Sequence, residues 1–186
     1  MKIWPMAAGL AVVAPIATSA TAEPQANAAL TIGVAGTGEQ AWWSQTRFSV
    51  GMHADTLFGR TSNKHFGVGP YAELLTLSRD LQLGAGPSVL VPVHPDLPLV
   101  LSAGPYARYS SHWGWEPGGS AQLFWGSRSY NYHSCYVMAA GLVAQLRYGL
   151  GDSHERTVLV GLHLDSEALA LPFLLLYEAL FGPRPK

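Results

Sequence analysis

The sequence predicts an all-β fold, an antiparallel up-and-down β-barrel of about eight strands with a short apolar helix at its C-terminus. Seven stretches between Arg47 and Glu167 alternate apolar residues with small or polar ones, and a period of two is that of a β-strand. Short connections rich in Gly, Pro, Asn and polar residues separate these stretches, as antiparallel hairpins require. The chain between them offers no helix-length crossover, which argues against a parallel sheet.

The N-terminal residues 1–22 are predicted to be a cleaved signal peptide. A lysine at the second position precedes an apolar run over 6–16, and Ala20-Thr21-Ala22 forms an A-x-A cleavage site. The apolar run is too short for a membrane anchor and contains Pro15. The remaining chain, residues 23–186, has the length of a single domain.

Composition restricts the class of protein further. Only 12% of residues are charged, about half the usual share for a soluble domain, while 48% are hydrophobic. This combination fits either a dense soluble β-core or a barrel whose outer face contacts lipid. The net charge of −1 and the absence of Lys/Arg runs argue against a nucleic-acid partner. Cys135 is the only cysteine, and we interpret it as a packing residue inside a strand.

The strands follow one another along the chain at regular intervals. Seven are predicted at about 46–60, 66–77, 81–93, 97–109, 114–128, 135–149 and 157–167. An eighth is expected from residues 29–37, where alternation is brief. A helix is predicted at about 170–181, because Pro172 stands near its start, Gly182 follows its end, and Leu, Ala and Glu favour helices. A strand remains the alternative for this segment.

Three neighbouring strands carry a Gly-Pro pair at their centres, at Gly69-Pro70, Gly86-Pro87 and Gly104-Pro105. Proline cannot donate to a β-ladder and usually marks an edge or a bulge. Because alternation persists through each pair, we interpret them as bends that curve the sheet toward closure. The alternative is that they are turns between shorter strands.

Sorting the strand residues by parity separates two faces of different chemistry. One face is apolar and carries aromatic residues at strand ends, as an aromatic girdle does: Tyr109, Trp113, Trp115, Trp125, Tyr136 and Tyr148. The other face carries Arg47, His53, Asp55, Glu73, Arg108, Glu116, Arg128, Arg147, His163, Asp165 and Glu167. It has many glycines and no lysine, and arginine–carboxylate pairs tolerate burial better than lysine does. We therefore predict a polar network inside the barrel and an apolar surface facing lipid.

These features resemble those of small outer-membrane β-barrels. Over roughly residues 29–170 the chain is similar to the eight-stranded OmpA/OmpX-like class, and most to uncharacterised secreted barrels with Gly-x-Gly-Pro-Tyr strands such as Gly67-Val68-Gly69-Pro70-Tyr71. The resemblance implies a place in the bacterial outer membrane, with membrane lipids and the barrel-assembly machinery as partners. The chain departs from this class at its end, because it continues past Phe181 instead of ending on an aromatic strand.

The expected role is structural or ligand- and surface-binding, of unknown specificity and oligomeric state. Tyr, Arg and Glu inside a small barrel should fill it, so we do not expect conduction. His53 and His163 share a face with carboxylates, but the pattern places no serine nucleophile beside them. Because the histidines are dispersed along the chain, we expect no metal site, and we expect no cofactor. A lipid A-modifying acyl hydrolase or transferase and a soluble periplasmic lipocalin-like carrier, whose faces would be inverted, remain alternatives.

Overall fold

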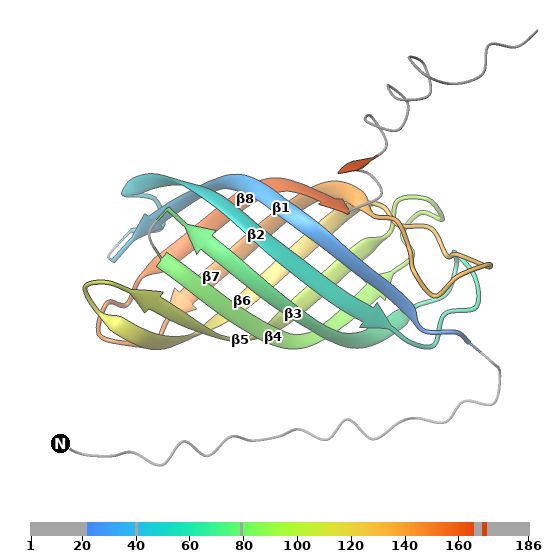
Figure 1. The fold of residues 1–186 in the computed structure, drawn as a ribbon, viewed down its shortest axis with the longest axis horizontal. Coiled ribbons are helices and arrows are strands. Elements are labelled where there is room, and N and C mark those ends of the chain that lie inside the picture. The colour runs from blue at the N-terminus through green and yellow to red at the C-terminus, as the bar shows by residue number, and fades with distance from the viewer. Residues whose placement is uncertain (1–21, 40, 79, 166–168, 171–186) are drawn as a thin grey trace, which may run out of the picture.

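The chain forms a closed antiparallel β-barrel in which each strand pairs with its sequence neighbours (Figure 1). The structure is a computed structural model that describes residues 22–39, 41–78, 80–165 and 169–170. Its strands are β1 (Gln25–Gly38), β2 (Gln45–Leu57), β3 (Gly67–Leu77), β4 (Asp80–Val91), β5 (Leu99–Ser110), β6 (Gly114–Ser127), β7 (Ala140–Gly149) and β8 (Arg156–Asp165). Pairing of β8 with β1 closes the barrel. The predicted eight-stranded up-and-down barrel is therefore confirmed, and β1 supplies the eighth strand.

The largest departure from the predicted strands lies before β7. The strand predicted over 135–149 begins at Ala140, and residues 128–139 form a connection. Part of this connection runs beside β1 as extended chain: Ala26 N donates to Cys135 O, and Val137 N donates to Ala26 O. That pairing explains why the sequence alternates there without forming a barrel strand. Cys135 is exposed in this connection, so its interpretation as a packed strand residue was wrong.

Several predictions fall on residues outside the described ranges. These are the signal peptide over 1–21, Glu167, and the helix at about 170–181 beyond its first residue. They stay predictions. Among the residues that the structure describes, no helix is long and apolar enough to cross a membrane.

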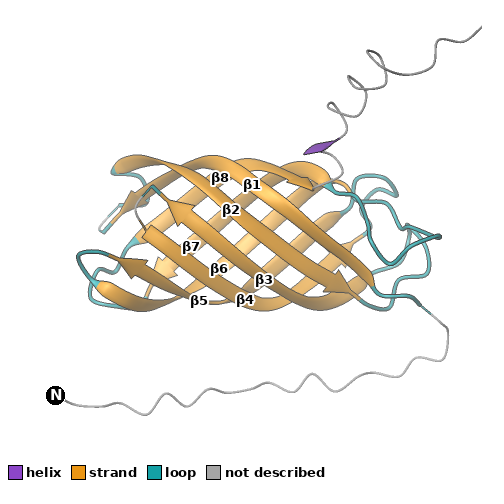
Figure 2. Cartoon of the chain, viewed as in Figure 1, coloured by secondary structure: helices purple, strands orange, loops and turns teal. Residues whose placement is uncertain are grey.

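The two ends of the barrel differ in their connections (Figure 2). At the turn end, strands are joined by 39–44, 78–79, 111–113 and 150–155. At the loop end, on the right in Figure 2, the longer connections 58–66, 92–98 and 128–139 gather. The first residue of β1 and the last of β8 also lie at the loop end. The loop end therefore has more residues outside the strands, and these residues can cover the opening of the barrel.

The Gly-Pro pairs lie within continuous strands. β3, β4 and β5 run through Pro70, Pro87 and Pro105, and Pro70 pairs directly with Pro87. Between β4 and β5, ladder pairs run from Leu81 to Gly84 and resume at Ser88. In the gap, a Cβ built on Gly86 would lie 2.9 Å from the Gly104 Cα. The strands thus approach closely where neither has a side chain, which supports the interpretation of these sites as bends.

Gly104→Ala is expected to lower the unfolding midpoint of the barrel. A Cβ on Gly104 would collide with the Ala85 carbonyl oxygen and lie 2.9 Å from the Gly86 Cα, both backbone atoms. Overpacking of this kind costs about 1–3 kcal/mol. Gly119→Ala on β6 is the matched control, because a Cβ there meets nothing within 4 Å. Urea unfolding of both variants in detergent measures the effect, and equal midpoints would contradict the close approach of β4 and β5.

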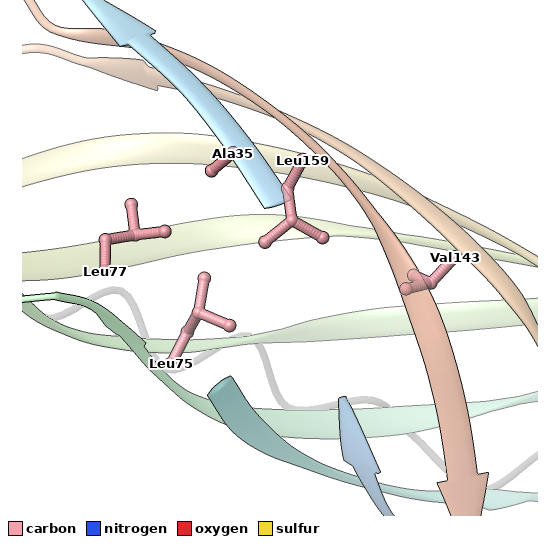
Figure 3. Packing of buried hydrophobic residues seen from close by; sticks show 5 residues of the cluster. All are labelled: Ala35, Leu75, Leu77, Val143 and Leu159. Carbon is pink, nitrogen blue, oxygen red and sulfur yellow. The ribbon is translucent and has the colours of Figure 1, made fainter. Parts of the chain in front are cut away.

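Apolar side chains also lie inside the barrel, in two clusters. Figure 3 shows the first, Ala35, Leu75, Leu77, Val143 and Leu159. The second comprises Leu57, Leu90, Val100, Phe124 and Ala139. Its members come from strand ends next to the loop end and from the 128–139 connection. Full burial of a Leu, Val or Phe side chain contributes about 1.5–3 kcal/mol. The interior is therefore a mixed core, in which apolar clusters accompany the charged side chains.

Candidate functional site

The strand residues inside the barrel are mainly polar, and those outside are mainly apolar. Nine of the eleven predicted network residues are each at most 8% exposed: His53, Asp55, Glu73, Arg108, Glu116, Arg128, Arg147, His163 and Asp165. Arg47 is half-buried. Large apolar side chains such as Phe48, Met52, Leu101, Leu142 and Val160 are exposed. The charged interior is thus the main candidate for a functional site.

The aromatic residues predicted as a girdle lie mostly on the outside. Tyr109, Trp113, Trp115, Trp125 and Tyr148 are exposed, and Tyr136 is half-buried. Trp113 belongs to the 111–113 turn rather than to a strand, and Tyr136 to the 128–139 connection, where its hydroxyl donates to Ala28 O at 3.1 Å. Their contact with a membrane interface remains a prediction.

Near the loop end, a buried ion pair joins β2 to the residue that follows β6. Arg128 donates through Nη1 to Asp55 Oδ2 at 2.6 Å and through Nη2 to Asp55 Oδ1. His53 Nε2 lies 3.7 Å from Asp55 Oδ2, and the His53 ring stacks on Tyr71 with centroids 5.3 Å apart. Bidentate guanidinium–carboxylate pairs are among the strongest hydrogen bonds in proteins. Asp55 therefore connects Arg128 and His53 within this group.

His163 belongs to the same group but makes few polar contacts. Its ring lies edge-on to His53 at 5.4 Å and to Phe124 at 5.1 Å. Its Nδ1 is 3.2 Å from Thr31 Oγ1. Asp165, two residues on, accepts a hydrogen bond from Asn27 Nδ2 at 3.3 Å. The alternating His-x-Asp pattern therefore places both residues inside the barrel, where each meets a polar side chain of β1.

In the middle of the barrel, a second group spans the lumen between β3 and β7. Arg147 Nη2 lies 2.7 Å from Glu73 Oε1, and Arg147 Nη1 donates to Gln82 Oε1 at 2.6 Å. Gln145 Nε2 donates to Glu73 Oε2 at 3.1 Å and also to Gln122 Oε1. The Arg147 guanidinium carbon stands 5.2 Å from the centre of the Tyr106 ring. Side chains from β3, β4, β5, β6 and β7 thus fill this layer.

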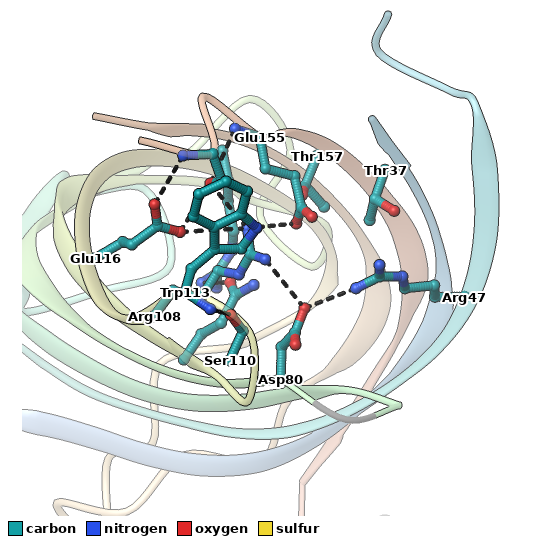
Figure 4. Close-up of polar contacts among 12 residues, drawn as sticks. Thr37, Arg47, Asp80, Arg108, Ser110, Trp113, Glu116, Glu155 and Thr157 are labelled. Carbon is teal, nitrogen blue, oxygen red and sulfur yellow. Dashed lines mark hydrogen bonds and ion pairs between the residues drawn. The ribbon is translucent and has the colours of Figure 1, made fainter. Parts of the chain in front are cut away.

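A third group lies at the turn end and is drawn in Figure 4. Asp80 Oδ2 accepts from Arg47 Nη1 at 2.6 Å and lies 3.5 Å from Arg108 Nη2. Arg108 Nη1 lies 3.0 Å from Glu155 Oε1 and 3.9 Å from Glu116 Oε2. Burial raises the pKa of the Glu155 carboxyl, and the Arg108 charge opposes that shift. At the turn end, two arginines therefore form ion pairs with three carboxylates.

The turn-end group borders open space. A cavity of about 330 Å³ is lined by Arg47, Asp80, Arg108, Trp113 and Glu155 among others. A second cavity of about 480 Å³ shares Glu39, Arg47 and Glu155 with it. Both open outward. The turn end is thus a place where a polar ligand can reach charged side chains of the interior without disturbing the strands.

Two members of the turn-end group were not predicted, because they lie just outside the predicted strands 81–93 and 157–167. Asp80 is the first residue of β4, and Glu155 directly precedes β8. The sequence does contain a signal for both residues. Asp80 is an even number of positions from Gln82, and Glu155 is an even number of positions from His163, so each continues the polar face of its strand. Extending each alternation outward by two residues would have placed both on the polar face.

The interior places one hydroxyl beside a histidine. The hydroxyl beside His163 is that of Thr31, and both residues are at most 3% exposed, inside the barrel. A lipid-modifying site instead needs a nucleophile and a base that reach the acyl chain. No group of three or more His, Cys, Asp or Glu among the described residues is arranged to hold a metal ion. The charged side chains of the network mainly bind one another.

The fold and interior together define a closed, ion-paired, eight-stranded β-barrel. No protein-family model and no curated protein matches the chain. Among solved structures, a de novo designed transmembrane β-barrel is similar at 13% identity and a TM-score of 0.37, over 75% of this chain and 94% of that one. Ail, the attachment invasion locus protein of Yersinia pestis, solved in complex with the heparin analogue sucrose octasulfate, is similar at 14% identity and a TM-score of 0.37, over 76% and 97%. The class rests on the strand ladder itself rather than on these similarities.

Proposed function

We propose that the protein is an integral β-barrel of the bacterial outer membrane, of the small OmpA/OmpX-like kind, with a filled, non-conducting lumen. The observation that carries this proposal is the polarity of the closed barrel. Leu123 on the outer face is 38% exposed, whereas its neighbour Gln122 inside is 7% exposed. A surface of exposed Phe, Met, Leu and Val around a charged interior is stable in lipid and unfavourable in water.

The backbone supports the same location. A closed barrel leaves no strand edge, so each strand has hydrogen-bonding neighbours on both sides, as a hydrocarbon environment demands. The strands are 10 to 14 residues long, and about 9–11 residues of tilted strand cross a bilayer. The barrel therefore has the dimensions of a membrane-spanning one.

The packed interior supports a structural or ligand-binding role over transport. Arg147, Glu73 and Gln145 bridge the middle of the lumen, and interiors of eight-stranded barrels are just wide enough for side chains to fill. The turn-end cavities, bordered by Arg47, Asp80 and Glu155, are the place for a small polar ligand or a surface contact. A soluble lipocalin-like carrier would instead need an apolar interior.

Cell fractionation tests the proposed location. The mature protein is expected in the outer-membrane fraction, resistant to extraction by alkaline carbonate and with a gel mobility that changes on heating, as folded barrels behave. Recovery of mature protein in the soluble periplasm would overturn the proposal. Stepwise conductance of the purified protein in a planar bilayer would contradict the filled lumen alone.

A further inference from the structure

One buried charge near the loop end lacks the partners that the other interior charges have. Arg60 lies in the 58–66 connection and is 0% exposed, yet within the part of the chain that the structure describes its Nε, Nη1 and Nη2 atoms make no hydrogen bond. Arg128 and Arg147, by contrast, each bind a carboxylate. A guanidinium carries N–H donors on all three nitrogens, and leaving a buried charge without partners is costly.

The surroundings of Arg60 add positive charge and an aromatic wall. Its guanidinium carbon stands 5.8 Å from the centre of the Tyr130 ring. Burial and the nearby Arg128 charge lower the pKa of Arg60 to about 10, so it stays cationic at neutral pH. The Asp55 carboxylate is already held by both terminal nitrogens of Arg128. The positive charge of Arg60 is thus available to another anion.

The side chain of Arg60 is also held in position. A Cβ on Gly67 would lie 2.8 Å from the Arg60 Cδ and 2.9 Å from its Cγ, so the stem of Arg60 packs directly on this glycine. The 128–139 connection is tied to the 58–66 connection, because Tyr130 N donates to Asn63 Oδ1. A guanidinium fixed with free donors is preorganised for an oxyanion, whose geometry its planar fork matches.

We propose that Arg60, between the 58–66 and 128–139 connections and beside Tyr130 and Arg128, binds a small free oxyanion of the phosphate or sulfate class. The anion completes the hydrogen bonds of Arg60 and ties the two connections together. Since Arg60 is enclosed, the anion enters when these connections part or while the loop end folds. This site lies at the opposite end of the barrel from the turn-end cavities and is independent of the proposed function.

The test uses the full chain refolded in an uncharged maltoside detergent. Sodium phosphate is compared with sodium chloride at equal ionic strength. At ten times its Kd, phosphate should raise the melting midpoint of the wild type by about 3–6 °C over chloride. Arg60→Met should lose this phosphate-specific shift, and in chloride it should melt at a higher temperature than the wild type. Lys64→Met is the matched control, because Lys64 is an exposed cation of the same connection and its loss should leave the shift intact.

Other outcomes would overturn the proposal. An equal phosphate shift in Arg60→Met and the wild type would assign it to a general salt effect. No phosphate-specific shift in the wild type would mean that water satisfies Arg60. If Arg60→Met does not fold, equilibrium dialysis of the wild type against millimolar phosphate decides, and absence of binding there refutes the site. Stabilisation by phosphatidylglycerol vesicles but not by inorganic phosphate would identify a lipid headgroup as the ligand and would also refute it.

Discussion

Replacing Asp55 with alanine is expected to destabilise the barrel by about 3–5 kcal/mol, because removing one partner of a buried ion pair leaves the other charge uncompensated. Arg128, 2% exposed, would lose both hydrogen bonds of its terminal nitrogens. The second cation nearby, Arg60, would lose a neighbouring negative charge that favours its charged form. Urea unfolding in detergent or vesicles measures the loss, with Asp152→Ala, at an exposed position of the 150–155 turn, as the control.

A double-variant cycle separates the ion pair from simple loss of packing. Once Asp55 is alanine, Arg128→Met removes the stranded charge, so the double variant should be more stable than the sum of the two single effects predicts. Coupling between residues in direct contact is typically about 0.5–3 kcal/mol. Strictly additive effects would mean that the Asp55–Arg128 pair contributes nothing specific to stability.

Leu123→Arg should impair insertion into lipid vesicles far more than Gln122→Arg. Leu123 lies on the outer face of β6, paired with Leu101 of β5 and Ala144 of β7. An arginine on the lipid face near the bilayer midplane costs about 2–4 kcal/mol. Inside the barrel, Gln122 and Glu73 both accept hydrogen bonds from Gln145, so Glu73 is within reach of an arginine at position 122.

The measurement is the fraction of chain that reaches the folded, mobility-shifted form in vesicles. Leu123→Met serves as a control for the loss of leucine itself, because it conserves volume and apolar character. Equal insertion of the two arginine variants, or the reverse order, would mean that the faces of β6 are assigned wrongly.

Most of what the sequence predicts about this fold comes from the alternation of odd and even positions along the strands. Alternation locates the strands and separates the side chains of β2 and β5 into two sets, and the structure buries one set, including His53 and Arg108. It failed where extended chain pairs outside the regular ladder, as in the segment that contains Cys135 and Tyr136. A local pattern cannot distinguish a barrel strand from a connection that lies along β1.

The partners inside the barrel were not predictable, because they depend on how far the strands are staggered around it. The sequence places Asp55 and Arg128 on one face but gives no reason to pair them, since they are separated by 73 positions along the chain. Arg60 was missed because the strand predicted over 46–60 includes it, whereas β2 ends at Leu57 and parity does not apply to the irregular connection that follows. Arg60, a buried charge without a carboxylate partner among the described residues, therefore lies in a segment whose side-chain directions alternation does not predict.

The alternation of outer and inner residues also determines where the length of this chain can change. Adding or deleting one residue within β6 would shift every following position of that strand to the opposite side, so Leu123 and Trp125 would turn toward the ion pairs and Gln122 toward the surroundings. The same change in the 92–98 connection alters only the span between two strands. Variation in length among homologous chains should consequently be confined to the connections, and within the strands it should occur in steps of two residues.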